Sequence, residues 1–178
     1  MISAQAWGAT VEERRARLPC DELLPGARCR WDRAVTVDAP AAVIYRWLCQ
    51  LKLAPYSYDL LDNFGRRSPR ELVAGTERLK AGERFMSIFS LASHAPDQHL
   101  TLRSRRLAVT YAVRTDPAVS RLIVRVRFDS PGGRIGAATL GRALALGDLL
   151  MMRKQLLTLR ALAELDASAR PLAHSRRA

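Results

Sequence analysis

The sequence predicts an α+β domain in which an antiparallel β-sheet packs against one long C-terminal helix. The chain has 178 residues, of which 48% are apolar, and this is enough to form the core of a single domain. The middle of the chain alternates apolar and polar residues with the period of two that is typical of strands. Residues 139–167 are rich in Leu and Ala and contain no proline, which favours a helix of about 25 residues.

The first predicted strand leads directly into a helix. Residues 31–39 alternate in the manner of a half-buried strand. Residues 38–51 follow as an amphipathic helix, with Pro40 in the first turn, where its missing N–H costs nothing. Residues 58–65 predict a second, short helix that ends at Gly65.

Four further strands complete the predicted sheet, over residues 83–91, 99–104, 107–115 and 120–128. The last of them separates its residues onto two faces, with Leu122, Val124, Val126 and Phe128 opposite Arg121, Arg125 and Arg127. This alternation is typical of an antiparallel sheet with one solvated face. We therefore expect the three arginines on the solvent side.

The ends of the chain give the predicted domain limits. Residues 1–30 form an N-terminal arm with a short helix, for which Thr10 and Glu13 provide a capping box. Residues 31–166 form the domain, and 167–178 a disordered tail. Steps of about 100° per residue place one apolar stripe on the C-terminal helix, made of Ala145, Leu149, Met152, Leu156, Leu159 and Ala163.

This order of elements is that of the helix-grip fold, a curved antiparallel sheet wrapped around a long C-terminal helix, with two short helices after the first strand. Three parts of the chain resemble the bacterial START-like, or SRPBCC, superfamily that is often labelled polyketide cyclase/dehydrase-like. They are "WGATVEE" with "LPCDELLPGA", "RAVTVDAPAAVIYRWLCQL" with "YSYDLLDNFGRRS", and "DLLMMRKQLLTLRALAE". The resemblance spans roughly residues 7–165, and it departs from the family at Ala54 and Pro55, where members tend to carry a Gly-Trp pair.

The resemblance implies that an apolar or amphipathic small molecule, such as a lipid or a polyketide, binds in a cavity between the sheet and the last helix. A few polar groups in such a pocket orient the ligand, and residues 54–67 supply several of them near its expected mouth. The candidate ligand-binding residues are Tyr56, Tyr58, Asp59, Asp62, Asn63, Met86, Tyr111, Leu149, Met152, Arg153 and Leu156. A purely structural role stays open, because the same stretch also suits a short amphipathic helix, and Arg153 also suits an ion pair with a buried aspartate.

Two other classes of function remain open. A cyclase or dehydratase would use Asp59 or Asp62 as general base and Tyr58 as proton donor, provided that burial brings their pKa values closer to neutrality. A nucleic-acid binder would use the net charge of +12 and the arginines of residues 120–128 on phosphates. That strand carries no aromatic residue between its arginines on which bases would stack, so we do not expect nucleic-acid binding.

No cofactor or metal is expected. His94 and His99 are too few ligands for a zinc site. Residues 136–143 approach the phosphate-loop pattern, but Arg142 and Ala143 replace its lysine and hydroxyl residue. The N-terminus lacks the apolar stretch of a secretory signal, and no run approaches the roughly 20 apolar residues of a membrane span. We expect a cytoplasmic protein without stable membrane insertion, while the ligand, any catalysis and the oligomeric state stay open.

Overall fold

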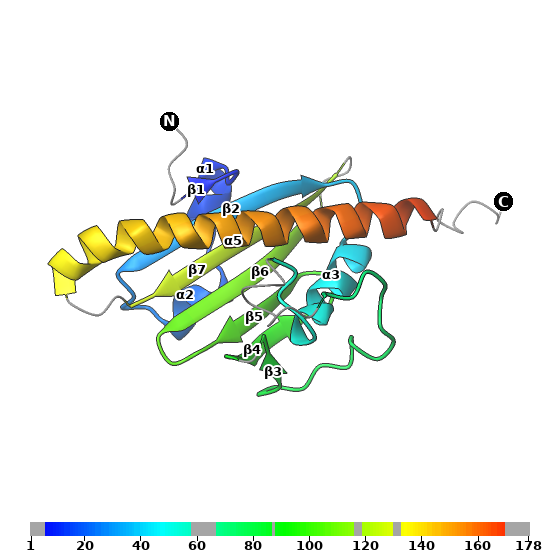
Figure 1. Ribbon diagram of the computed structural model, residues 1–178, viewed down its shortest axis with the longest axis horizontal. Helices are drawn as coiled ribbons and strands as arrows, with labels where there is room; N and C mark the ends of the chain where they lie inside the picture. The colour runs from blue at the N-terminus through cyan, green and yellow to red at the C-terminus, as the bar shows by residue number, and fades with distance from the viewer. Residues whose placement is uncertain (1–5, 58–66, 87, 116–118, 130–132, 170–178) are drawn as a thin grey trace.

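A curved sheet packs against one long helix in the computed structural model (Figure 1). The structure describes residues 6–57, 67–86, 88–115, 119–129 and 133–169. For residues 133–149 it describes the backbone alone. The described residues form a seven-stranded sheet in the order β1-β2-β7-β6-β5-β4-β3. Its strands are β1 (Ala6–Trp7), β2 (Cys29–Val37), β3 (Arg84–Phe85), β4 (Phe89–Ala95), β5 (His99–Arg103), β6 (Leu107–Thr115) and β7 (Ser120–Phe128). Neighbouring strands are antiparallel except for β1, which pairs in parallel with β2. The predicted helix-grip fold is confirmed.

The sheet differs from the prediction at two places. The strand predicted over 83–91 is divided into β3 and β4, because Met86 has a left-handed backbone with φ of 44° that interrupts an extended strand. Strand β1 was not predicted, since its two residues are too short to show any alternation. It exists through its pairing with Asp32 and Arg33 of β2.

The helices after β2 follow the prediction as far as they are described. Helix α3 (Ala41–Cys49) continues into the 3-10 helix η1 (Gln50–Lys52). The side chain of the buried Gln50 accepts from the N–H of Val73 at 2.8 Å and donates to the carbonyl of Glu71 at 3.1 Å, which holds the segment after residue 67 against η1. The second short helix, predicted over 58–65, lies outside the described residues.

The C-terminal helix α5 (Gly133–Ala169) is longer than predicted at both ends. Its first residues include glycines that suggested a turn. A helix tolerates glycine at a cost of roughly 1 kcal/mol each, so local composition alone does not end it. In the described part of the apolar stripe, Leu156, Leu159 and Ala163 are buried and Met152 is partly buried. The main core cluster is formed by residues of the sheet, of α3 and of α5, the helix that crosses the sheet in Figure 1.

The opposite face of the sheet is covered by the N-terminal arm. Helices α1 (Val11–Arg15) and α2 (Pro19–Leu23) lie on it, where Leu18 and Cys20 form a second core cluster with Ala34, Ala108, Ala112 and Ile123. The predicted capping box of Thr10 and Glu13 is present. Gly8 brings the arm against β2: its φ is 71°, and a Cβ there would collide with the carbonyl oxygen of Ala34.

The prediction that Arg121, Arg125 and Arg127 face solvent is therefore wrong. The side chain of Arg125 is 0% exposed, and all five of its N–H donors are satisfied. It donates to the carboxylates of Asp32 and Asp21 at 2.7 and 2.6 Å, and to the carbonyls of Glu13, Arg14 and Ala16 at the end of α1.

The neighbouring arginines are also held by the arm. Arg121 donates to both carboxylate oxygens of Glu13, at 2.7 and 2.9 Å, and Arg127 donates to the carbonyls of Leu24 and Pro25. These three arginines are called the arm arginines below. Because the arm occupies them, the strand surface on which the nucleic-acid hypothesis depended is not available to phosphates.

Candidate functional site

A buried polar cluster lies in the core between the sheet and α5, centred on Gln155. The hydroxyl of Tyr111 on β6 donates to Gln155 Oε1 at 2.8 Å. Gln155 Nε2 donates to the carbonyl of Pro55, after η1, and contacts the sulfur of Met86 at 3.8 Å. Gln155 is only 3% exposed, and burying an amide is costly unless it is hydrogen-bonded. The cluster thus ties α5 to β6, to the loop after η1 and to the end of β3.

Unusual backbone flanks this cluster. Tyr56, which follows the Pro55 carbonyl, and Met86 both have positive φ values, 56° and 44°. A left-handed non-glycine residue is uncommon and persists where its surroundings fix it. Tyr56 is fully buried, and its ring meets Trp47 of α3 edge-on with centroids 6.0 Å apart. Left-handed backbone therefore occurs beside two partners of the Gln155 amide, at Met86 itself and at the residue after Pro55.

A second polar group, Arg33 of β2, lies on the same concave face. It alternates in phase with Trp31 and Val35, both core residues, and its exposed fraction is 0%. Its guanidinium carbon is 5.9 Å from the centroid of the Trp31 ring, and Nη1 donates to the carbonyl of Asp32. A cation at this depth is costly unless a polar or charged group interacts with it.

Strand register relates the two polar groups. Arg33 is the partner of Val124 on β7, and Val124 is the partner of Tyr111 on β6. Adjacent strands are about 4.8 Å apart, so the backbones of Arg33 and Tyr111 are separated by about 10 Å across one row of the sheet. The concave face therefore carries a cation and a phenol–amide pair with an apolar residue between them.

The structure brings several predicted site residues together and leaves others unplaced. Tyr56, Tyr111 and Leu156 are buried in one core cluster, against which Met86 and Met152 pack. Arg153 lies apart from it: its side chain is exposed, and its guanidinium carbon is 5.6 Å from the centroid of the Trp7 ring. Tyr58, Asp59, Asp62 and Asn63 lie outside the described residues, as does the side chain of Leu149.

Sequence reasoning missed Gln155 and Arg33. Gln155 is three residues after Met152 and four before Leu159, so helical spacing places it on the buried face. Arg33 is two residues before Val35, so strand alternation places it on the apolar face. In both cases the spacing indicates a buried position, but a polar residue type is not normally expected in a core.

Two titratable groups of α3, Tyr45 and Cys49, are held neutral by burial. Burial raises the pKa of the Cys49 thiol to about 12, and burial also raises the pKa of Tyr45. Burial lowers the pKa of His99, as does the nearby His94, whose Nδ1 is 3.0 Å from the Tyr45 hydroxyl. A protonated thiol is a poor nucleophile and a poor metal ligand, and the described residues include no group of three His, Cys, Asp or Glu placed to hold a metal ion.

The described members of the Gln155 cluster are an amide, a phenol, a thioether and a carbonyl, with no carboxylate among them. Such groups give and accept hydrogen bonds, and they orient a bound molecule rather than remove protons from it. The cyclase or dehydratase hypothesis depends on Tyr58, Asp59 and Asp62, so it stays a prediction.

Comparison with known proteins supports the fold. No family model matches the chain, and no curated protein does. Among solved structures, the KanY protein superposes with a TM-score of 0.53 at 14% identity, covering 75% of this chain and 95% of KanY. The di-domain ARO/CYC StfQ of the steffimycin biosynthetic pathway superposes with a TM-score of 0.50 at 13% identity, covering 78% of this chain and 51% of StfQ.

This chain thus spans about half of StfQ. A Polyketide_cyc-like protein from Corynebacterium glutamicum gives a TM-score of 0.46 at 13% identity, covering 82% of this chain and 97% of that protein. The chain has the helix-grip fold, which it shares with these solved structures. In the described part of the chain, no helix combines the length and the apolar character needed to cross a membrane.

Proposed function

We propose that this protein binds an amphipathic small molecule between the concave face of its sheet and helix α5. The observation that carries this proposal is the row in which Arg33 and the Tyr111–Gln155 pair lie on an otherwise apolar face. A core built only for stability has little need of two polar groups there, since well-packed apolar residues are often at least as stabilising as buried ion pairs. Fixed polar groups in an apolar setting are typical of ligand sites.

The Gln155 amide has hydrogen-bonding capacity for a ligand. One N–H meets the sulfur of Met86, and a thioether is a weak acceptor. Met side chains also adapt to new shapes easily. A carbonyl or hydroxyl oxygen of a ligand would displace Met86 from this N–H and form a stronger hydrogen bond.

The expected ligand follows from this geometry. It has an apolar body that packs on Val124 and Leu156 and an oxygen acceptor for the Gln155 amide. Polyketides and lipids fit this description. StfQ is a protein of the steffimycin biosynthetic pathway, so small molecules of biosynthetic pathways are a suitable first set for screening.

The test uses Nile red, an uncharged apolar dye, and one substitution that fills the proposed binding space. Met152 is partly buried against the core, whereas its neighbour Met151 is 39% exposed. We expect the parent protein to bind Nile red saturably. Met152→Trp is expected to abolish the binding without lowering the melting temperature, and the control Met151→Trp is expected to bind the dye like the parent.

Two outcomes would count against the proposal. If the parent binds no dye and Met152→Trp lowers stability by the roughly 1–3 kcal/mol typical of overpacking, the space is filled with side chains. If both tryptophan variants bind the dye equally, the dye binds elsewhere on the protein.

A further inference from the structure

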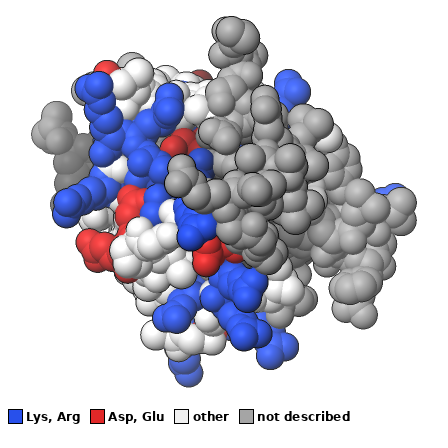
Figure 2. Space-filling model, turned by 90° about the vertical axis from the view of Figure 1, so that its left-hand side faces the viewer, with Lys and Arg blue, Asp and Glu red and all other residues white. Residues whose placement is uncertain are grey.

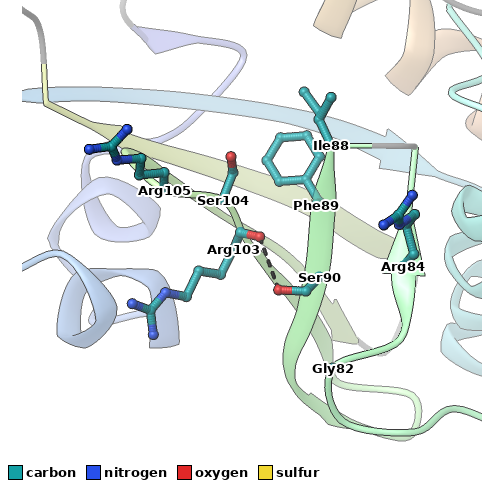
Figure 3. A pocket seen from close by; sticks show the side chains of 8 residues that line it. All are labelled: Gly82, Arg84, Ile88, Phe89, Ser90, Arg103, Ser104 and Arg105. Carbon is teal, nitrogen blue, oxygen red and sulfur yellow. Dashed lines mark hydrogen bonds between the residues drawn. The ribbon is translucent and has the colours of Figure 1, made fainter.

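A pocket of about 420 Å³ lies at the edge of the sheet, where β3, β4 and the end of β5 meet (Figure 3). This volume falls within the roughly 300–1,000 Å³ of small-molecule sites. Its lining consists of Gly82, Arg84, Ile88, Phe89, Ser90, Arg103, Ser104 and Arg105. The Ser90 hydroxyl donates to the carbonyl of Arg103 at 3.3 Å, which joins β4 to β5 at the pocket. The pocket shares no lining residue with the Gln155 cluster.

Three arginines from three segments line this pocket, and no carboxylate does. Arg84 extends from β3 on one side of β4, and Arg103 and Arg105 extend from β5 and the following turn on the other (Figure 3). All three are exposed, and no described residue forms an ion pair or hydrogen bond with their guanidinium groups. They are called the pocket arginines below.

The surface near this pocket carries basic side chains without visible carboxylates, unlike the surface higher on the same end of the molecule. Figure 2 shows the end of the molecule that is on the left in Figure 1. In its upper part, lysine and arginine side chains are mixed with carboxylates. In its lower part, at the height where Figure 1 places β3 and β4, the basic side chains stand without visible carboxylates.

The same pocket has an apolar wall. Ile88 is 68% exposed, and Phe89 beside it is only partly buried. A large apolar side chain at this exposure, next to several cations, matches a ligand that has an anionic group joined to an apolar group. The Ser104 side chain of the lining adds a hydroxyl group that can donate to an oxyanion, whereas the Ser90 hydroxyl already donates to the carbonyl of Arg103.

We propose that this pocket binds a phosphate monoester that carries an apolar group, through Arg84, Arg103 and Arg105. A phosphate monoester has a charge of about −1.5 to −2 near neutral pH, which matches several guanidinium groups better than the single charge of a carboxylate does. Guanidinium groups also fit phosphate oxygens in bidentate geometry. The apolar group of the ligand would pack on Ile88 and Phe89. This proposal does not depend on the function proposed for the sheet–helix interior.

The first experiment measures binding of octyl phosphate by titration calorimetry at fixed, low ionic strength. We expect saturable binding to the parent, weakened about tenfold or more in Arg103→Gln/Arg105→Gln, because each charge-assisted hydrogen bond contributes more than the 1.4 kcal/mol of a tenfold change. The matched control is Arg14→Gln/Arg15→Gln, which removes the same charge from exposed positions of α1. We expect the control to bind octyl phosphate nearly like the parent.

An apolar variant and a vesicle assay sharpen the test. Ile88→Ser is expected to weaken the binding of octyl phosphate while leaving the binding of inorganic phosphate unchanged. Phosphatidylcholine vesicles containing phosphatidic acid, a lipid phosphate monoester, show whether the bound phosphate belongs to a membrane lipid or to a soluble ester. Binding to both octyl phosphate and these vesicles indicates a lipid headgroup, and binding to octyl phosphate alone indicates a soluble ester.

Three results would overturn the proposal. The first is the absence of saturable octyl phosphate binding by the parent. The second is an equal loss of binding in the control pair, because diffuse positive charge would then be the cause. The third is binding only to vesicles, with no difference between phosphatidic acid and phosphatidylglycerol, which would indicate a non-specific basic surface.

Discussion

Arg125 of β7 and Arg105 of the turn after β5 belong to one basic protein, yet the first is completely buried and the second is exposed. The arm arginines are covered by a segment that supplies Glu13, Asp21 and a set of helix carbonyls. The pocket arginines are covered by no described segment and line a pocket instead. The difference teaches that a guanidinium is buried where the chain brings carboxylates and carbonyls to it, and stays exposed where no described segment covers it.

The electrostatics of the arm arginines agree with a structural role. Burial acts to lower the pKa of Arg125, but its hydrogen bonds and charge interactions with Asp32 and Asp21 outweigh that effect and hold the pKa above its ordinary value. Burial acts to raise the pKa of Glu13, but the hydrogen bonds from Arg121 and from the Thr10 N–H outweigh it, so this pKa lies below its ordinary value. Both groups therefore stay charged in the folded protein.

The largest expected effect is that of removing Arg125. We expect Arg125→Ala to lower the free energy of unfolding by about 3–5 kcal/mol, because it removes a fully buried partner of Asp32 and leaves that buried carboxylate with only the partly exposed Arg30 as a described ion-pair partner. The helix carbonyls of Glu13, Arg14 and Ala16 lose their donor at the same time. Urea denaturation measures the change.

The matched control for this substitution is Arg105→Ala, which removes the same side chain from an exposed position. We expect a change within about 0.5 kcal/mol, as is usual for surface sites. If the two variants have similar stability, the arm does not hold Arg125 in solution as it does in the structure. The contrast between the two sets of arginines would then disappear.

A smaller effect is expected from Glu13→Gln, which breaks the bidentate pair with Arg121. The cost near neutral pH should be about 1.5–3 kcal/mol, the range of a hydrogen bond to a charged group. Because the pKa of Glu13 is lowered on folding, its contribution is complete above its unfolded value of about 4.5 and is lost as the pH falls through the folded value.

Denaturation curves of the parent and Glu13→Gln should therefore converge below about pH 4.5. A stability difference that stays constant down to acidic pH would show that the ionised carboxylate is not what stabilises the arm. Arg114→Gln is a suitable control for charge, since Arg114 is exposed and adds only a weaker charge interaction with Glu13.

The smallest effect concerns Arg153, an exposed arginine whose partner is an aromatic ring. Its guanidinium carbon is 5.6 Å from the Trp7 ring centroid, which links α5 to strand β1 of the arm. We expect Arg153→Ala to cost about 0.5–1 kcal/mol, the value of a cation–π contact at an exposed site. Lys154→Ala, at the next and equally exposed position, should cost less. Equal costs for the two variants would show that the ring contact contributes nothing.

The sequence by itself determined the elements that depend on local patterns. Alternation predicted β2, β5, β6 and β7, helical spacing predicted α3 and the described buried residues of α5, and the Thr10–Glu13 pair predicted the start of α1. It also determined which residues share a face, because the periods of strands and helices are fixed by backbone geometry. Leu156, Leu159 and Ala163 of the predicted apolar stripe are accordingly buried.

Only the tertiary structure decided what lies against each face. The alternation of apolar residues with Arg121, Arg125 and Arg127 is the same whether water or the arm covers the arginines, because either can satisfy the guanidinium groups. Likewise, no local pattern brings Gln155 to Tyr111 or places Arg33 in their row, since these contacts join segments that are far apart in the sequence. The paired and unpaired arginines of this protein differ in their distant partners, and distant partners meet only when the chain has folded.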